Sequence, residues 1–155
     1  MKPKTYTKLY VHIVFAVKHR ESLLTKQHRD ELFKYISGII TNNKCKSIII
    51  NGYTDHIHIL VGLNPVISIS NLVADIKRAS SLFINEEKKW FSGKFYWQDG
   101  YGAFSYSRSQ IDDVYNYILN QEKHHKTMSF KDEYLKILNK FDIEYNDDYL
   151  FDFFQ

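Results

Sequence analysis

The sequence predicts an α+β fold in which short strands and two long helices alternate in the order β-α-β-β-α-β, with further helices after the last strand. Two patterns support this: short runs of β-branched and aromatic residues, typical of strands, and apolar residues repeated every three to four positions, typical of amphipathic helices. The 155 residues include only 6 glycines and 2 prolines, and no linker-like segment or repeat divides them. We therefore expect one domain over residues 1–155.

The first half of the chain contains three predicted strands and one helix. Residues 8–17 are rich in Tyr, Val, Ile and Phe and predict the first strand. Thr25 is a suitable cap for a helix over 26–42. The apolar positions of that helix recur at helical spacing: Leu32, Phe33, Ile36, Ile39 and Ile40. Residues 45–52 and 56–63 predict the next two strands, because the segment NGYTD between them has the composition of a turn.

The second half contains a long helix, a short strand and two further helices. Residues 68–90 predict the long helix. Its apolar stripe consists of Val73, Ile76, Ala79 and Phe83. Residues 101–106 predict the fourth strand. Ser109 and Asp112 have the spacing of a capping box, which would open a third helix over 110–125. A shorter helix around 130–139 precedes an acidic, aromatic tail.

This order of elements is the ferredoxin-like or RRM-like arrangement, in which two helices cover one face of an antiparallel sheet. The other face is left for ligands or for a further helix. Because many unrelated activities share the arrangement, the function has to be inferred from particular residues.

Composition narrows the class of protein. The single cysteine, Cys45, excludes a disulfide framework within the chain and favours a reducing, cytoplasmic setting. The apolar run LYVHIVFAV is too short to span a bilayer and contains His12, so we interpret it as a strand. The net charge of +3 is only mildly basic. Of the 12 Tyr, 11 Phe and 2 Trp, most are expected in the core, and some could stack on unpaired bases.

The third predicted strand carries an unusual pair of histidines, His56 and His58. Side chains two residues apart in a strand point to the same face, so the two imidazoles can share one cation. The alternative is a pair of histidines on a solvated sheet face. A histidine-triad nucleotide hydrolase is excluded, because its third histidine is replaced by Leu60.

The third predicted helix contains YNYILNQEKHH. Tyr117 and Gln121 lie four residues apart, hence on one helical face, where Val114 and Ile118 can dock the helix on the sheet. Tyr115 points roughly the opposite way. A tyrosine hydroxyl and an amide oxygen delivered to a histidine pair would make a metal site beside a nucleophile. Taken alone, Tyr117 and Gln121 are also compatible with an ordinary amphipathic helix.

Taken together, these motifs resemble a known family. DHIHILV in the third strand, then YWQDGYGAFSYS, then YILNQEKHH closely resemble the HUH single-tyrosine transposases, very small insertion-sequence enzymes that act on single-stranded DNA. FAVKHRESLL is similar to their F-x-x-K-x-R segment. The resemblance runs from about residue 6 to residue 126 and does not extend to the tail after Phe141.

The resemblance implies a role for several residues. His56 and His58 would be metal ligands, Gln121 a third ligand, and Tyr117 the nucleophile on the added C-terminal helix. The metal would be Mg²⁺ or Mn²⁺, the ions that the family uses. His124 and His125 match the family's trailing pair. His124 shares the face of Tyr117 and either reaches the site or only lies favourably at a helix end.

Asp55, next to the first ligand, either orients a ligand histidine or belongs to the turn. Attack by the tyrosine would give a 5′-phosphotyrosine link and a free 3′-OH, which allows strands to be rejoined without ATP.

The resemblance also implies DNA hairpins and a second copy of the chain, in a homodimer, as partners. Candidate phosphate contacts, each also explicable as a solvated charge, are Lys18, His19, Arg20, Lys77, Arg78, Lys88 and Lys89. Two alternatives remain open: a domesticated relative acting on chromosomal palindromes, and a non-catalytic RRM-like nucleic-acid-binding protein. The second would present aromatic residues on its central strands, where this sequence has histidines.

Overall fold

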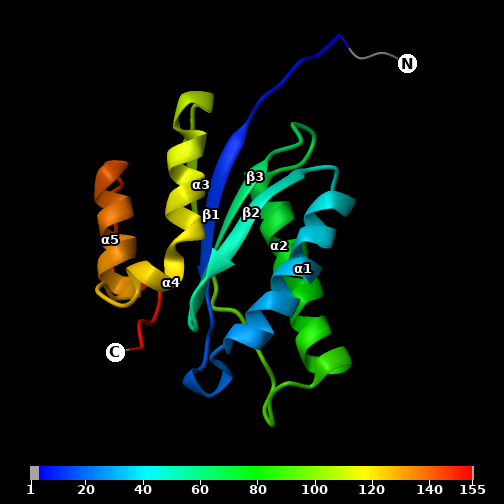
Figure 1. Ribbon diagram of the computed structural model, residues 1–155, viewed down its shortest axis with the longest axis vertical. Helices are drawn as coiled ribbons and strands as arrows, with labels where there is room; N and C mark the ends of the chain where they lie inside the picture. Colours follow the sequence, from blue (N-terminus) through cyan, green and yellow to red (C-terminus); the bar gives the residue numbers. More distant parts are fainter. Residues whose placement is uncertain (1–3, 155) are drawn as a thin grey trace.

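A four-stranded antiparallel sheet forms the centre of the molecule (Figure 1). The computed structural model describes residues 4–154. The strands are β1 (Tyr10–Ala16), β2 (Lys46–Gly52), β3 (His56–Gly62) and β4 (Gly102–Tyr106), in the spatial order β2-β3-β1-β4. This is the sheet of the predicted α+β, ferredoxin-like arrangement, so the predicted fold class is confirmed.

Helices cover both faces of this sheet (Figure 1). On one face lie α1 (Lys26–Asn42) and α2 (Ile69–Leu82), and on the other lie α3 (Ile111–Leu119), α4 (Gln121–His124) and α5 (Phe130–Lys140). Four short helical turns, η1 to η4, connect or extend these elements: Arg20–Ser22, Phe83–Lys88, Arg108–Gln110 and Asp147–Tyr149. We call the two sides of the sheet the α1–α2 face and the α3–α5 face.

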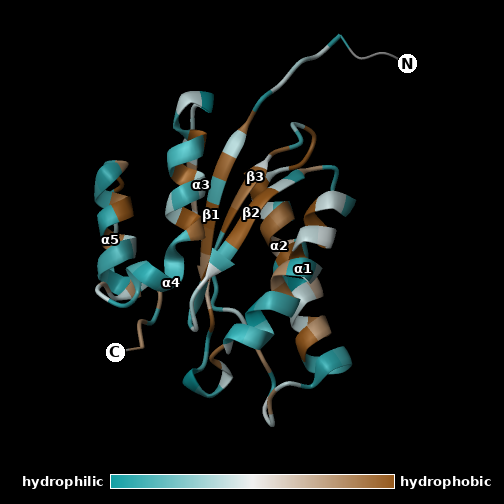
Figure 2. Cartoon of the chain, in the orientation of Figure 1, coloured by the Kyte–Doolittle hydropathy of each residue, from teal (hydrophilic) through white to brown (hydrophobic). Residues whose placement is uncertain are grey.

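The register of the strands divides their side chains between the two faces. Ile13 pairs with Ile59, and both side chains are buried in the core toward the α1–α2 face. Val14, the residue after Ile13, pairs with His58, the residue before Ile59. Since neighbouring residues in a strand point to opposite faces, Val14 and His58 point to the α3–α5 face. Figure 2 shows hydrophobic residues concentrated on the central strands, whereas α5 is mostly hydrophilic. The first two helices therefore close an apolar core, and the later helices close a face that carries histidines.

The second predicted helix is shorter than expected. The sequence predicted one helix over 68–90, but the α-helix ends at Leu82 and continues as a π-helical turn to Lys88. Lys89 then adopts a left-handed conformation with φ 52°. A residue in that conformation is a common end signal for a helix, which explains why the chain leaves the helix there.

The third predicted helix, expected to run over 110–125, is interrupted. Its α-helical part ends at Leu119, and a separate turn, α4, begins at Gln121. The side-chain amide of Asn51 on β2 donates hydrogen bonds to the carbonyls of Ile118 and Leu119, at 2.9 and 3.0 Å. These bonds satisfy two of the carbonyls that a helix end leaves without a partner, so the sheet itself fixes where α3 stops.

The start of α3 also differs from the prediction. The capping box is formed by Ser107 and Gln110, whose side chains bond to each other's backbone, and not by Ser109 and Asp112. Because Arg108–Gln110 forms a 3-10 turn first, the cap lies two residues earlier than the apolar pattern indicated.

Among the described residues 4–154, no helix is long and apolar enough to cross a membrane.

Candidate active site

The two histidines of β3 are fully buried on the α3–α5 face. His56 and His58 each have 0% of their surface exposed. The ring of Phe130, from α5, stacks on His56 with the ring centroids 3.8 Å apart and the planes at 5°. The alternative of two histidines on a solvated sheet face is therefore wrong. Buried imidazoles require polar partners, and several other elements supply them.

Gln121 is the first of these partners. Its Oε1 atom lies 3.1 Å from Nε2 of His56. Gln121 is fully buried at the start of α4, immediately after the break that Asn51 imposes on α3. The structure thus brings together the three residues that the sequence suggested as metal ligands.

The turn that carries Gln121, α4, is bonded to the first turns of α1. The buried guanidinium of Arg29, in the first turns of α1, donates to the Glu122 carboxylate at 3.0 Å and to the carbonyl of Leu24 at 2.8 Å. Lys26 also reaches Glu122, at 3.3 Å. A guanidinium with fixed donors on both sides is a rigid anchor, so it holds α4 against the edge of the sheet.

The central residue of the site, Glu133 on α5, was not predicted. It is only 2% exposed, and its carboxylate is surrounded by polar groups. Its Oε1 atom lies 3.3 Å from Nε2 of His56 and 3.2 Å from Nε2 of His58. Its Oε2 atom accepts a hydrogen bond from the Gln121 amide at 2.7 Å. Helix α5 therefore supplies a buried anion at the point where β3 and α4 meet.

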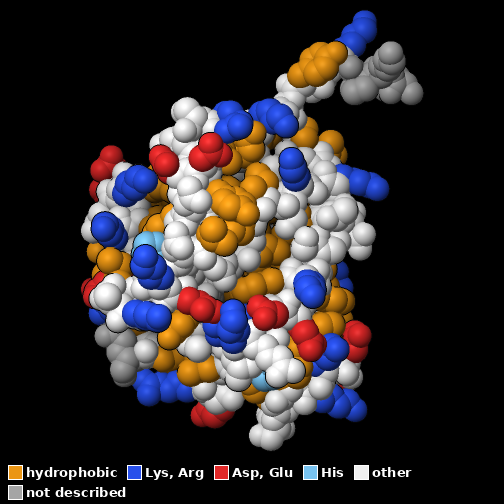
Figure 3. All heavy atoms as spheres, in the orientation of Figure 1, with side chains coloured by type: hydrophobic (Ala, Val, Ile, Leu, Met, Phe, Trp, Pro, Cys, Tyr) orange, Lys and Arg blue, Asp and Glu red, His pale blue; other side chains and the backbone are white. Residues whose placement is uncertain are grey.

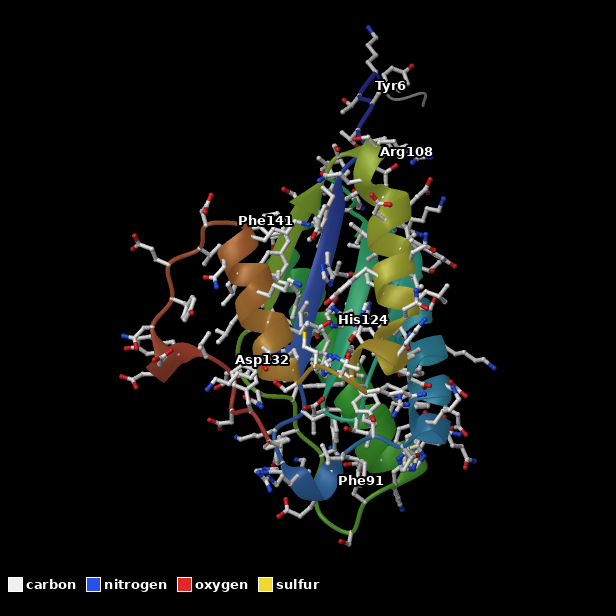
Figure 4. The ribbon with its side chains drawn as sticks, turned by 60° about the vertical axis from the view of Figure 1, so that its left-hand side comes forward. Tyr6, Phe91, Arg108, His124, Asp132 and Phe141 are labelled. Carbon is white, nitrogen blue, oxygen red and sulfur yellow. The ribbon has the colours of Figure 1, made fainter. Side chains whose placement is uncertain are left out.

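Of the two trailing histidines, His125 joins the cluster. Its Nε2 atom lies 3.1 Å from Oε1 of Gln121 and 3.1 Å from Oε1 of Glu133. His124 lies instead against the ring of Tyr117, with centroids 4.9 Å apart. In Figure 4, His124 lies between α3 and α5, over the sheet. The sequence had left open whether His124 reaches the site or only lies at a helix end, and that reasoning had assumed a continuous helix from Tyr117.

The spacing of these donors suits one divalent ion. Four donor atoms lie close together, Nε2 of His56 and His125 and Oε1 of Gln121 and Glu133, and Nε2 of His58 contacts only Oε1 of Glu133. Their close contacts range from 3.1 to 3.3 Å. Ligands bonded to a common ion at about 2.1 Å, in tetrahedral or octahedral geometry, lie about 3.0–3.4 Å apart. One ligand atom from each of His56, His125 and Glu133 lies within 4.8 Å of the others, whereas His58 does not belong to this group. The donor set, imidazoles with amide and carboxylate oxygens, fits a first-row or alkaline-earth dication.

Tyr117 reaches the same carboxylate. Its hydroxyl donates a short hydrogen bond to Oε2 of Glu133. Burial raises the pKa of the Tyr117 phenol well above its usual range, and the negative charge of Glu133 raises it further. The phenol thus stays protonated unless a base accepts its proton. Tyr115, two residues earlier, is 38% exposed and points away from this cluster, as the helical spacing predicted.

The electrostatics of the metal-free cluster centre on Glu133. Burial alone would raise the pKa of the Glu133 carboxyl, but the imidazoles around it lower that pKa well below its usual range. Burial would lower the pKa of His56, but hydrogen bonds to Asp55 and Glu133 outweigh it and raise the pKa to about 9. For His58, burial prevails, and its pKa is lowered. With this raised pKa, the metal-free His56 ring carries a proton on both nitrogens at neutral pH. A cation bound here would take the place of the proton on Nε2.

Two further residues contact the Nδ1 atoms of these imidazoles, on the side away from the cluster. Oδ1 of Asp55 lies 2.7 Å from Nδ1 of His56, which leaves Nε2 directed at the cluster. Nδ1 of His58 lies 2.7 Å from Nε2 of His12, a buried residue of β1. His12 was noted in the first strand but given no role. Its period-two position, in step with Val14 and Ala16, is the signal that places it on this face.

The predicted phosphate contacts lie elsewhere. Lys77 and Arg78 belong to α2, on the opposite face of the sheet from Tyr117. The Lys77 ammonium donates to the carbonyls of Gln98 and Gly100 at 2.8 and 2.7 Å, and Arg78 pairs with Asp75 at 3.2 Å. The Lys18 ammonium lies over the ring of Tyr96, and the Arg20 guanidinium over the ring of Phe154. Their predicted contact with DNA stays a prediction.

Comparisons with known proteins match most of the chain. The family model described as "Transposase IS200 like" matches residues 5–121. The matched segment includes His56, His58, Tyr117 and Gln121, whereas His125 and Glu133 lie beyond its end. No curated protein matches the chain.

Two solved structures have similar folds. One is the crystal structure of a candidate transposase from Deinococcus radiodurans R1, with 25% identity and a TM-score of 0.58, covering 78% of this chain and 96% of that chain. The other is a REP-associated tyrosine transposase bound to a REP hairpin, with 14% identity and a TM-score of 0.59, covering 81% of this chain and 73% of that chain.

Proposed function

Since this chain belongs to the IS200-like transposase family, we propose that it cleaves and rejoins single-stranded DNA through Tyr117 with the help of a divalent metal ion. The observation that carries the proposal is the convergence of five groups from one chain. The Tyr117 hydroxyl, the Gln121 amide and three imidazoles all contact the carboxylate of Glu133.

The proposed ligands are His56, His58 and Gln121, as the family resemblance implied, together with His125 and Glu133. Mg²⁺ or Mn²⁺ is the proposed ion. When bound, such an ion polarises a phosphodiester and stabilises the charge that develops on its oxygens. Asp55 has a supporting role: by accepting the Nδ1 proton of His56, it keeps the Nε2 lone pair available for the ion.

The residues around Tyr117 have distinct roles in the proposed reaction. The Tyr117 oxygen bonds to the phosphorus, the bond from phosphorus to the 3′ oxygen breaks, and the DNA downstream of the cut is left on the enzyme as a 5′-phosphotyrosine. The Glu133 carboxylate accepts the hydrogen bond of the phenol and so orients it, but its lowered pKa makes it a poor base, so the phenol proton is released to water. The departing 3′ oxygen takes up a proton and becomes a free 3′-OH, which can attack the link in the reverse direction.

Single-stranded DNA with hairpin ends is the proposed substrate, and residues 1–155 are proposed to act as one domain. A homodimer is also proposed, because the outer side of α3 leaves Tyr115 and Leu119 exposed. Light scattering should then give a mass about twice the 18.5 kDa of the chain. A monomer at micromolar concentration that still joins strands would disprove the dimer. Action on dispersed chromosomal palindromes, by a domesticated relative, would use the same site and chemistry.

The RRM-like alternative is not favoured. An RRM binds RNA on an open sheet, where aromatic residues stack on bases. Here α3 and α5 cover the corresponding face, and the central strands present buried histidines.

The experiment that tests the proposal is the capture of the covalent intermediate. Single-stranded DNA from the flanks of the gene, labelled 3′ of the cut, should remain attached to the protein in a denaturing gel when Mg²⁺ or Mn²⁺ is present. Tyr117→Phe removes one oxygen and should eliminate the adduct. Tyr115→Phe, on the outer side of the same helix, is the matched control and should form it normally.

An adduct that persists in Tyr117→Phe, or that maps by peptide mass to Tyr106 or Tyr115, would show that the nucleophile is a different residue.

A further inference from the structure

A cavity of about 380 Å³ opens between α3 and α5, beside the candidate active site. Its lining includes His12 and Tyr106 from the sheet, Val114 and Tyr117 from α3, and Glu133 and Ile137 from α5. The volume lies within the range of small-ligand pockets, about 300–1,000 Å³. Because Tyr117 and Glu133 belong both to the active-site cluster and to this lining, a molecule in the cavity would lie directly beside the reacting hydroxyl.

The walls of the cavity suit a flat, partly apolar ring. Val114 and Ile137 face it from the two helices, and Tyr106, about half-buried at the end of β4, adds an aromatic surface. Aromatic and aliphatic walls of this kind bind nucleic acid bases by stacking, without requiring a particular base.

His12 adds an unsatisfied polar group to this lining. It is 1% exposed, its Nε2 bonds to His58, and its Nδ1 has no hydrogen-bond partner among the described residues. With or without a proton, Nδ1 keeps a donor or an acceptor without a partner, and buried polar groups of that kind usually mark a ligand or a water.

Two lysines from α5 lie at the exposed edge of the cavity, Lys136 and Lys140. The Lys140 ammonium lies 5.6 Å from the centre of the Tyr106 ring. Asp113 is the one carboxylate in the lining besides Glu133. Figure 3 shows lysine and arginine side chains gathered around α5 on this side of the molecule. Ammonium groups at the edge of an aromatic pocket fit the phosphate of a nucleotide whose base is inside.

We infer that this cavity binds one nucleotide of the DNA strand, the one adjoining the phosphate that Tyr117 attacks. The base enters between Val114 and Ile137, where it stacks on Tyr106 and bonds to His12. Lys136 and Lys140 hold its phosphate. This inference rests on the proposed function, but it concerns residues that the family model does not reach, because α5 lies beyond residue 121.

The test uses the intact protein and the four 5′-deoxynucleoside monophosphates as probes, titrated one at a time and followed by the ¹⁵N NMR signals of the histidine rings. Nucleotides should move the His12 signals, whereas inorganic phosphate alone should not. Lys136→Gln with Lys140→Gln should weaken nucleotide binding about tenfold, the usual scale for lost charge-assisted bonds. Lys126→Gln with Lys131→Gln removes the same charge outside the cavity and should weaken binding less than twofold.

A second variant fills the cavity. Ile137→Trp should abolish the nucleotide-dependent shift, and Leu82→Trp, at a 52% exposed position on α2 outside the lining, should preserve it. If no nucleotide moves the His12 signals, if inorganic phosphate moves them as far, or if the two lysine pairs weaken binding equally, the inference is wrong. Adduct formation by a protein that fails this test would overturn the pocket and leave the proposed function intact. Normal nucleotide binding without any adduct would support the pocket and overturn the proposed function.

Discussion

Both faces of the sheet are buried, but β3 places its isoleucines on one face and its two histidines on the other. On the α1–α2 face, Ile57 and Ile59 of β3 are completely enclosed by apolar neighbours. On the α3–α5 face, His56 and His58 of the same strand are just as completely enclosed, but their nitrogen atoms meet imidazole, amide and carboxylate groups, and the Phe130 ring stacks on His56. One strand therefore serves two purposes, because alternate residues point in opposite directions.

The comparison shows that the two faces are stabilised by different interactions. The α1–α2 face is closed mainly by apolar packing, which tolerates many apolar residues of suitable size. The α3–α5 face buries polar groups, and each of these costs free energy unless it is hydrogen-bonded. A cluster of this kind is retained where function requires it, which is the physical reason to look for chemistry on this face.

The largest expected effect comes from removing the histidines of β3. His56→Ala with His58→Ala should lower adduct formation at least about a thousandfold, because the proposed ion loses two ligands and its charge no longer supports the reaction. Binding of hairpin DNA, measured by fluorescence anisotropy, should change little, because phosphate and shape dominate it. Full cleavage by this variant in Mg²⁺ would remove the metal from the mechanism.

The next effect concerns the neighbouring residue on the opposite face. Ile59→Ala should lower the free energy of unfolding by about 2–5 kcal/mol, the usual cost of emptying a filled core position. Urea unfolding followed by circular dichroism measures this. At a temperature where the variant is still folded, its adduct yield should match that of the unchanged protein. A large loss of adduct in the folded variant would mean that the two faces are not independent.

A smaller effect is expected at Asn51, which lies on β2 and ends α3. Asn51→Ala removes the two hydrogen bonds to the carbonyls of Ile118 and Leu119, at a cost of about 1–2 kcal/mol in unfolding free energy. Because these bonds also fix where Gln121 begins α4, the adduct yield should fall several-fold more than stability alone explains. Asn139→Ala, at an exposed position on α5, is the control and should change neither quantity.

The smallest effect is a pH dependence on the α1–α2 side. Burial lowers the pKa of Lys77 to about 8, below its unfolded value of about 10.4. Between these two values the unfolded chain binds more protons, so stability should rise as the pH increases through this window. Since Lys77 is only half-buried, the gain relative to Lys77→Met should be about 1 kcal/mol or less from pH 7 to pH 10. No difference between the two proteins in pH-dependent unfolding would contradict the shift.

Local pattern was enough for much of the fold. The strands and α1 follow from alternating or helical apolar spacing, and the Thr25 cap was found because it depends only on its next three residues. The break between α3 and α4 was missed because its cause is the side chain of Asn51, some 67 positions earlier in the chain. A contact of that kind leaves no mark in the helical pattern itself.

The site was partly predictable, because some of its residues belong to local sequence patterns. His56, His58, Tyr117 and Gln121 stood out because two short motifs place each pair on one face. Glu133 did not stand out, because a glutamate in an amphipathic helix is usually a solvated charge, and only the folding of α5 over the sheet buries it. His125 lies in the cluster and His124 lies against Tyr117, an arrangement that the spacing within one continuous helix could not predict, because α3 ends at Leu119 and α4 begins at Gln121.

The central claim is that the α3–α5 face forms one metal site built around Glu133. The most direct measurement is an anomalous difference map from crystals soaked in Mn²⁺. We predict one peak about 2.1–2.3 Å from Nε2 of His56 and Oε1 of Glu133, with His58, Gln121 and His125 in the same coordination sphere. A map without a peak here, in which Glu133 keeps its bonds to the imidazoles, Gln121 and Tyr117, would contradict the claim.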